Sequence, residues 1–326
     1  MVFDRILGQP TAVETLRRAL LSERVHHAYR FEGPDGVGKE LAAFALAQAL
    51  VCAEKPSIGC GECSACRRAV ALSADEPHVP QHPDVVLVER GLYPPAVLGR
   101  TSPETTGIGV EQIRRIVTAR AAYPPYEATR LVFIFRAAHE LTANAANALL
   151  KTLEEPRAGV HFLLLTDQPR RLLDTIRSRT LPIRFGPLPD AALLEILKQR
   201  GHGADERVAQ FAAGSAGRAL ELCDSDQVAR RERFVQDVLA ATLAPDLGAA
   251  LELTAGSQLD RAELGHDLQW LGQHFAGAAR QDSVGAERAL GEANRYLEVQ
   301  ETLKALERNV PPALALEALI ARLRRL

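Results

Sequence analysis

Gly33-Pro34-Asp35-Gly36-Val37-Gly38-Lys39-Glu40 has glycines and a lysine at the spacing of a Walker-type phosphate-binding loop. Such a loop joins a strand to a helix, and the flanking residues fit: Ala28–Phe31 has the pattern of a strand and Leu41–Leu50 that of a helix. The sequence therefore predicts a P-loop and not an ordinary glycine-rich turn. The residues expected to bind phosphate are Gly33, Gly36, Gly38 and Lys39.

Two positions that hold Mg²⁺ in working P-loops are occupied by other side chains here. A Ser or Thr hydroxyl normally follows the lysine, but this chain has Glu40. An Asp normally follows a second apolar strand, but Arg136 follows the run Leu131–Phe135. Because both ligands of one ion are lost, we expect a chain that does not hydrolyse ATP. The loop could still hold a diphosphate without metal, so binding of ATP or ADP stays open.

Four of the five cysteines lie close together, at Cys52, Cys60, Cys63 and Cys66. Four thiolates complete a tetrahedral Zn²⁺ shell, and the two-residue gaps allow consecutive thiolates to face one ion. All four positions would be filled by protein, so the ion would be structural and not catalytic. We predict zinc; disulfides and an iron–sulfur cluster are alternatives that the spacing leaves open.

Short apolar runs alternate with helical patterns up to Pro187, which is typical of a parallel α/β sheet covered on both faces. Beyond it, Ala, Leu, Glu and Arg recur at helical spacing. We predict a P-loop domain over 1–186 with a zinc insertion at 52–66, a helical lid over 187–223 and a helical domain over 224–326. The predicted strands are Ala28–Phe31, Val85–Val88, Leu131–Phe135, Phe162–Thr166 and Leu181–Phe185.

Composition narrows the class of protein. The chain has 326 residues, 47% of them apolar, without an apolar run long enough for a membrane span or a signal peptide. We therefore expect a soluble, cytoplasmic protein without a membrane partner. A net charge of −2 does not favour tight autonomous binding to nucleic acid. Arg114, Arg115 and Arg120 lie on one predicted helix and are interpreted as a solvated basic face, with a face toward DNA as the alternative.

Two later stretches closely resemble the clamp-loader branch of the AAA+ proteins: Asn147-Ala148-Leu149-Leu150-Lys151-Thr152-Leu153-Glu154-Glu155-Pro156 and Thr175-Ile176-Arg177-Ser178-Arg179-Thr180. The four-cysteine insertion after the P-loop helix extends the match over the whole first domain. The resemblance implies an AAA+ sheet domain, a small lid and a C-terminal helical collar that packs against other loader subunits. It also matches Thr166 to the sensor-1 position and Arg218 to the sensor-2 position.

Within that branch, the loss of both metal contacts resembles the delta-prime family of bacterial DNA polymerase III and not the ATP-hydrolysing gamma/tau family. The family's Ser-Arg-Cys motif is present as Ser178-Arg179-Thr180, with Thr in place of Cys. The resemblance implies that Arg179 acts as an arginine finger in the nucleotide site of a neighbouring gamma/tau subunit. Implied partners are gamma/tau and delta subunits, the sliding clamp indirectly, and primer-template DNA through the assembled complex.

The sequence thus predicts a clamp-loader subunit for DNA replication, without independent catalysis but part of a DNA-directed DNA polymerase holoenzyme. Two alternatives remain: an active, gamma/tau-like AAA+ ATPase with an unusual metal arrangement, and an independent zinc-dependent nucleic-acid-binding module. ATP hydrolysis by the chain alone would indicate the first, and tight DNA binding without partners the second.

Overall fold

The computed structural model describes residues 2–56, 58–102, 107–203, 208–209, 212–244, 248, 254, 259–280 and 285–326. They form two compact units, Met1–Leu220 and Glu221–Leu326. The boundary lies inside helix α10 (Ala216–Cys223), close to the predicted start of the third domain. The separation of a lid at 187–223 stays a prediction.

The first unit is built around a five-stranded sheet in the order β2-β3-β4-β1-β5, with every neighbouring pair parallel. Each predicted strand is present within two residues of its expected ends, so the predicted α/β class is confirmed. The strands are β1 (Ala28–Glu32), β2 (Val85–Val88), β3 (Leu131–Phe135), β4 (Val160–Thr166) and β5 (Leu181–Arg184).

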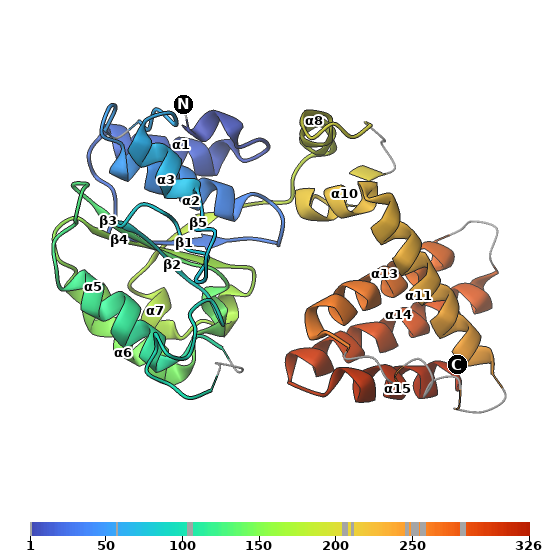
Figure 1. The fold of residues 1–326 in the computed structure, drawn as a ribbon. Helices are drawn as coiled ribbons and strands as arrows, with labels where there is room; N and C mark the ends of the chain where they lie inside the picture. The colour runs from blue at the N-terminus through green and yellow to red at the C-terminus, as the bar shows by residue number, and fades with distance from the viewer. Residues whose placement is uncertain are drawn as a thin grey trace. The chain divides into compact units, whose positions relative to one another are not determined.

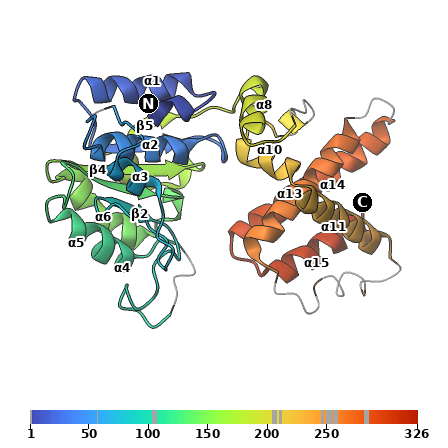
Figure 2. The same cartoon turned by 45° about the horizontal axis from the view of Figure 1, so that its top comes forward.

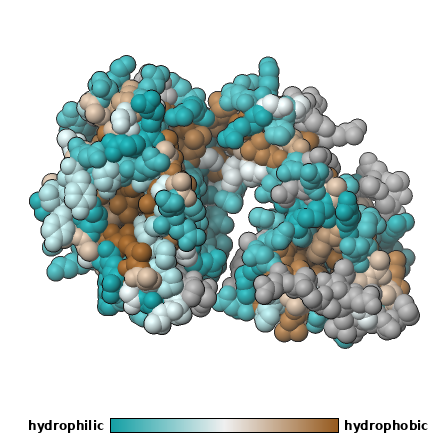
Figure 3. Space-filling model, in the orientation of Figure 1, coloured by the Kyte–Doolittle hydropathy of each residue, from teal (hydrophilic) through white to brown (hydrophobic). Residues whose placement is uncertain are grey.

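The two central strands β3 and β4 are buried along their whole length, as expected where helices cover both faces of a parallel sheet. Phe133 and Phe162 stack across them with ring centroids 5.3 Å apart. Figure 1 shows α1, α2 and α3 on one face and α5, α6 and α7 on the other. In Figure 3, hydrophilic side chains cover most of these helices, and hydrophobic surface gathers at the level of the sheet.

The helices of the first unit follow the strands in βα order. Proline at the first position starts α1, and the Thr142 hydroxyl caps α6 by accepting from the Ala145 N–H. The stretch from α4 to α5 is continuous and contains a π-helical turn, Ile113–Thr118. Their bounds are α1 (Pro10–Leu21), α2 (Lys39–Val51), α3 (Ser64–Val70), α4 (Val110–Gln112), α5 (Ala119–Ala121), α6 (Ala143–Glu154), α7 (Asp174–Arg177) and α8 (Asp190–Gln199), with short 3₁₀ turns at Val2–Arg5, Ala138–Glu140 and Pro169–Arg171.

Within its described residues, the regular secondary structure of the second unit is all helical, as predicted. It contains α11 (Ser225–Leu243), α13 (Arg261–Ala279), α14 (Ala286–Glu307) and α15 (Pro312–Leu323), which pack on one another (Figure 2). Leu268, Phe275, Leu316 and Leu319 lie in their common core. Among the helices within the described ranges, none has both the length and the apolar character needed to span a membrane.

The sheet order decides where functional residues can meet. The loop after β1 lies at the carboxyl edge of the sheet, where β4 ends beside it and β3 one strand further. The segment before β5 lies at the opposite, amino edge. Residues that are far apart in the sequence therefore lie together at one or the other of these two edges of the sheet.

Candidate functional site

The predicted phosphate-binding loop connects β1 to α2, as the motif requires. Gly36 has φ +72°, and a Cβ there would lie 2.2 Å from the Ser215 hydroxyl oxygen and 2.9 Å from the Gly217 backbone nitrogen. Gly36 also accepts a backbone hydrogen bond from Ala216 at 2.9 Å. The glycine is needed because the start of α10 approaches the loop so closely.

Lys39 turns back onto this loop. Its Nζ donates to the carbonyl oxygens of Gly33 at 2.7 Å and Pro34 at 2.5 Å, and 7% of the residue is exposed. Burial lowers the pKa of Lys39, although Asp35 and Asp167 act in the opposite direction. An incoming phosphate would have to replace two carbonyl contacts to bind this ammonium group.

The two side chains that replace the metal ligands contact each other. The guanidinium of Arg136, just beyond β3, forms an ion pair with Glu40 in the first turn of α2 and donates to Glu89 Oε2 at 2.9 Å. Burial acts to lower the pKa of Arg136, but the hydrogen bonds with Glu40 and Glu89 outweigh it and raise the pKa. A carboxylate–guanidinium bridge thus joins the two residues at which the sequence predicts the loss of metal ligands.

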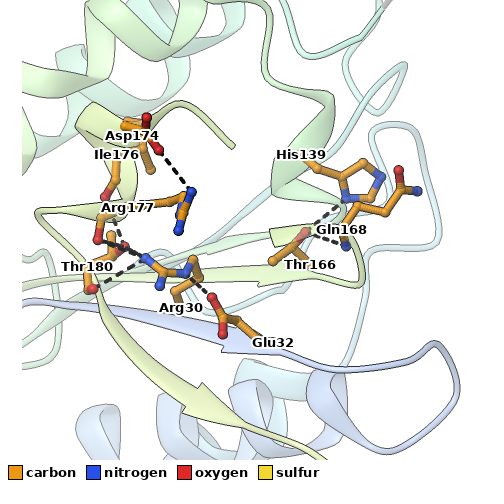
Figure 4. Close-up of polar contacts among 9 residues, drawn as sticks. All are labelled: Arg30, Glu32, His139, Thr166, Gln168, Asp174, Ile176, Arg177 and Thr180. Atoms are coloured by element: carbon orange, nitrogen blue, oxygen red, sulfur yellow. Dashed lines mark hydrogen bonds and ion pairs between the residues drawn. The ribbon is translucent and has the colours of Figure 1, made fainter. Parts of the chain in front are cut away.

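A cleft of about 670 Å³ opens beside this bridge, and its lining includes Lys39, Arg136 and Thr166. Thr166, the last residue of β4, is buried, and its hydroxyl is 3.2 Å from His139 Nδ1 (Figure 4). The same hydroxyl accepts from the Gln168 N–H at 3.0 Å. Lys39 and Thr166 therefore lie together at one edge of the sheet.

The four clustered cysteines converge at the end of α2 and around α3. Their sulfur atoms all lie within 4.8 Å of one another. The sulfur–sulfur separations include 3.6 Å for Cys52–Cys60, 3.9 Å for Cys52–Cys63 and 3.9 Å for Cys60–Cys66. A regular tetrahedron with Zn–S bonds of 2.3 Å has sulfur–sulfur edges of about 3.8 Å. The arrangement fits one tetrahedral ion and excludes disulfides, whose sulfurs are about 2.05 Å apart.

Backbone N–H groups point at these sulfurs. The amide of Lys55 is 3.3 Å from Cys52 Sγ, and that of Cys66 is 3.4 Å from Cys63 Sγ. Burial alone would raise the pKa of Cys63, but hydrogen bonds from Cys66, Cys60 and the backbone lower it to about 6. Burial raises the pKa of Cys66. The lowered pKa favours the thiolate form of Cys63 even without a bound ion. The raised pKa keeps Cys66 protonated until a cation binds its sulfur.

Arg179 lies between α7 and β5. Its guanidinium pairs with Glu154 at the end of α6, with Nε 2.7 Å from Oε1. It also donates to the Thr175 carbonyl at 2.9 Å and to the Ser178 hydroxyl at 3.2 Å, and 33% of the side chain is exposed. Glu154, Ser178 and Arg179 are among the residues that line a shallow pocket of about 420 Å³.

The strand register separates Arg179 from the loop of its own chain. Tyr29 pairs with Leu181 and Glu32 with Arg184, so Arg179 precedes one end of β1 and Gly33 follows the other. The five residues of β1 span roughly 16 Å at about 3.3 Å each. An arginine side chain does not extend that far, so Arg179 cannot contact a phosphate bound at Lys39 in the same chain.

One sequence interpretation is wrong. Arg114 and Arg115 are exposed, but Arg120 is not part of a solvated face, because it donates to the fully buried Asp84 at 2.6 Å. Asp84 also accepts from the backbone N–H groups of residues 126–128. Asp84 belongs to none of the sequence motifs, although an acidic residue directly before the apolar run Val85–Val88 was a usable signal.

Comparison with known proteins agrees with this fold. The family described as DNA polymerase III, delta subunit, matches residues 8–189. The delta-prime subunit of Bacillus subtilis is 32% identical over 222 residues, which is 68% of this chain and 61% of that protein. The delta-prime subunit of Haemophilus influenzae is 32% identical over 65% of this chain and 59% of its own length.

The gamma/tau subunit of Mycobacterium tuberculosis is 36% identical over 211 residues, 63% of this chain but 33% of its own length. The chain thus spans about a third of the gamma/tau relatives and about three-fifths of the delta-prime relatives. A gamma subunit-related protein from Thermotoga maritima has a TM-score of 0.49 and 18% identity over 96% of this chain and 98% of its own. Because the family match covers more than half of its residues, the chain belongs to the DNA polymerase III, delta subunit, family.

Proposed function

We propose that the chain is a delta-prime-type subunit of a DNA polymerase III clamp loader that helps to place a sliding clamp on primed DNA. In this proposal the chain has no ATPase activity of its own. It completes the nucleotide site of a neighbouring gamma/tau subunit with Arg179, next to Ser178. The gamma/tau and delta subunits are its direct partners, and primer-template DNA is bound by the assembled complex.

The observation that carries the proposal is the ion pair between Glu40 and Arg136. In an active relative the two positions would hold one Mg²⁺ between them. Here the carboxylate and the guanidinium neutralise each other, so a cation gains little from binding. The β- and γ-phosphates of a nucleotide would face the Glu40 carboxylate. Lys39 is occupied by the loop carbonyls as well. Both contacts support a subunit that does not turn over ATP.

Action in trans is supported by the two edges of the sheet. Arg179 lies at the amino edge, away from its own loop, and is partly exposed beside a shallow pocket. Glu154 holds the guanidinium in the isolated chain, and a phosphate of a neighbouring subunit would have to compete with that carboxylate. A positioned guanidinium stabilises charge on a transferred γ-phosphoryl group and is worth about 10³–10⁵ in rate in arginine-finger enzymes.

The zinc assignment belongs to the same proposal. The sulfur separations match one tetrahedral ion, and Cys52, Cys60, Cys63 and Cys66 would leave no open coordination position. The ion would fix the short α3 and its flanking turns to the end of α2, and it takes no part in nucleotide chemistry.

The proposal is tested by replacing Arg179 with alanine in a loader reconstituted from purified subunits. We expect normal assembly and a clear loss of clamp- and DNA-stimulated ATP hydrolysis, with the affected site slowed about 10³-fold. Arg179→Lys should resemble Arg179→Ala, because lysine lacks the planar fork that bridges phosphate oxygens. Arg177→Ala is the matched control, since its exposed side chain pairs with Asp174 in the same turn. Clamp loading by Arg179→Ala at the parental rate would contradict the proposal.

A further inference from the structure

Arg30 is an unusual residue for its place in the sheet. It is the third of five residues in β1, which lies between β4 and β5, and positions in such strands are ordinarily apolar. Only 6% of Arg30 is exposed. Burying a guanidinium is costly unless it is paired and fully hydrogen-bonded, so the contacts of Arg30 indicate what the charge does there.

Those contacts end on the two residues that flank Ser178-Arg179. Arg30 Nη1 donates to the Arg177 carbonyl at 2.9 Å and to the Thr180 carbonyl at 3.4 Å. It also donates to the Thr180 hydroxyl at 2.6 Å, and Nε pairs with Glu32 at 2.5 Å (Figure 4).

The Thr180 hydroxyl acts both as a hydrogen-bond acceptor and as a hydrogen-bond donor. It accepts from Arg30 and donates to the Ile176 carbonyl at 2.9 Å. Thr180 is buried, at 6% exposure, and stands where the resembled motif has Cys. A thiol is a weaker donor and acceptor than a hydroxyl, so the Thr makes a contact with the guanidinium that a Cys would make poorly. Arg30, Glu32 and Thr180 thus form a connected buried network behind the turn.

We propose that Arg30 is a positioning residue for Arg179, acting through the Thr180 hydroxyl. The inference rests on the proposed function, in which Arg179 acts on a neighbouring subunit. Arg30 fixes the backbone on both sides of Ser178-Arg179 to β1, an internal strand of the sheet. The partly exposed guanidinium of Arg179 then needs only a side-chain rotation to leave Glu154, while its Cα stays in place.

The test uses two variants of Thr180 in the reconstituted loader. Thr180→Val keeps the shape but removes the acceptor, and Thr180→Ser keeps the hydroxyl. We expect Thr180→Val to lower kcat of the Arg179-dependent hydrolysis about tenfold with KM for ATP nearly unchanged, because misplacement of a catalytic group costs rate and not ground-state binding. Thr180→Ser should stay within about twofold of the parent.

A second measurement does not depend on the loader. In the isolated full chain, amide hydrogen exchange over residues 175–181 should be faster in Thr180→Val and in Arg30→Lys, and unchanged in Thr180→Ser. The inference would be overturned if the Val and Ser variants lost kcat equally. It would also be overturned if Thr180→Val kept the parental kcat while Arg179→Ala was impaired. If Arg179→Ala were itself unimpaired, the proposed function would fail, and the exchange data would still decide whether Arg30 holds the turn.

Discussion

At the scale of single residues, the four clustered thiols differ in their burial. Cys60 and Cys63 are half-buried, whereas Cys52 and Cys66 are buried. Backbone N–H groups point at the sulfurs of Cys52, Cys60 and Cys63. Cys66 Sγ is 3.6 Å from the Gln48 carbonyl, which ties it to α2.

We expect the purified chain to contain about one equivalent of zinc, and Cys60→Ser to reduce that content, because an alkoxide ligand is not available to replace a thiolate at neutral pH. The sheet should survive the loss, since its core of buried residues around β3 and β4 does not include the cysteines. Cys223→Ser, outside the cluster, is the control and should leave the zinc content unchanged. The test is metal analysis of the chain purified under reducing conditions. Iron in place of zinc, or no metal, would contradict the assignment.

At the scale of elements, the ion pairs of Arg136 with Glu40 and Glu89 join three parts of the fold. Glu89 follows β2, Arg136 follows β3 and Glu40 begins α2. All three side chains are partly exposed, so the bridge contributes little to stability, on the order of 0–1 kcal/mol for each pair. In our proposal its consequence is for function, because it takes the place of the Mg²⁺ that an active P-loop holds.

We therefore expect no Mg²⁺-dependent ATP hydrolysis by the isolated chain. The double variant Glu40→Thr, Arg136→Asp restores oxygen ligands for the ion but should remain inactive, because Ala137 stands where active relatives place the glutamate that orients water. A phosphate-release assay with the parent, the double variant and Lys39→Ala is sufficient. Turnover by the parent that disappears in Lys39→Ala would show that the loop is catalytic after all.

Elements were more predictable from the sequence than the contacts between them. Apolar runs located all five strands, but β4 begins two residues earlier than predicted, because the buried His161 interrupts its apolar start. The pairing of Glu40 with Arg136 spans 96 positions and requires the sheet order, which no local pattern contains.

The same limit applies to the turn around Arg179. Its motif was visible in the sequence, but the buried contacts of Arg30 and Thr180 depend on β1 and β5 being neighbours. The role of Arg179, the nucleotide occupancy of the loop and the identity of the ion stay predictions.

At the scale of the whole molecule, the chain has two units with separate cores. The first is centred on β3 and β4, and the second on α11, α13, α14 and α15. Within the second unit, Arg231 is buried and contacts Glu221 and Asp267, with its guanidinium 5.8 Å from the centre of the Trp270 ring. Separate cores suggest separate tasks, with assembly assigned to the helical unit.

We expect the fragments 1–223 and 224–326 to fold independently and to divide these tasks. The first should retain zinc and the sheet but fail to assemble with gamma/tau and delta subunits, whereas the second should be helical and enter the complex. The cut leaves Glu221 on the first fragment, but Arg231 keeps Asp267 as a partner, so the second fragment should lose only about 1 kcal/mol of stability. Circular dichroism tests the folding, and size-exclusion chromatography with purified partners tests the assembly, with the full chain as the control. If fragment 1–223 assembled and fragment 224–326 did not, the helical unit would not be the collar, and the sheet unit would hold the complex together.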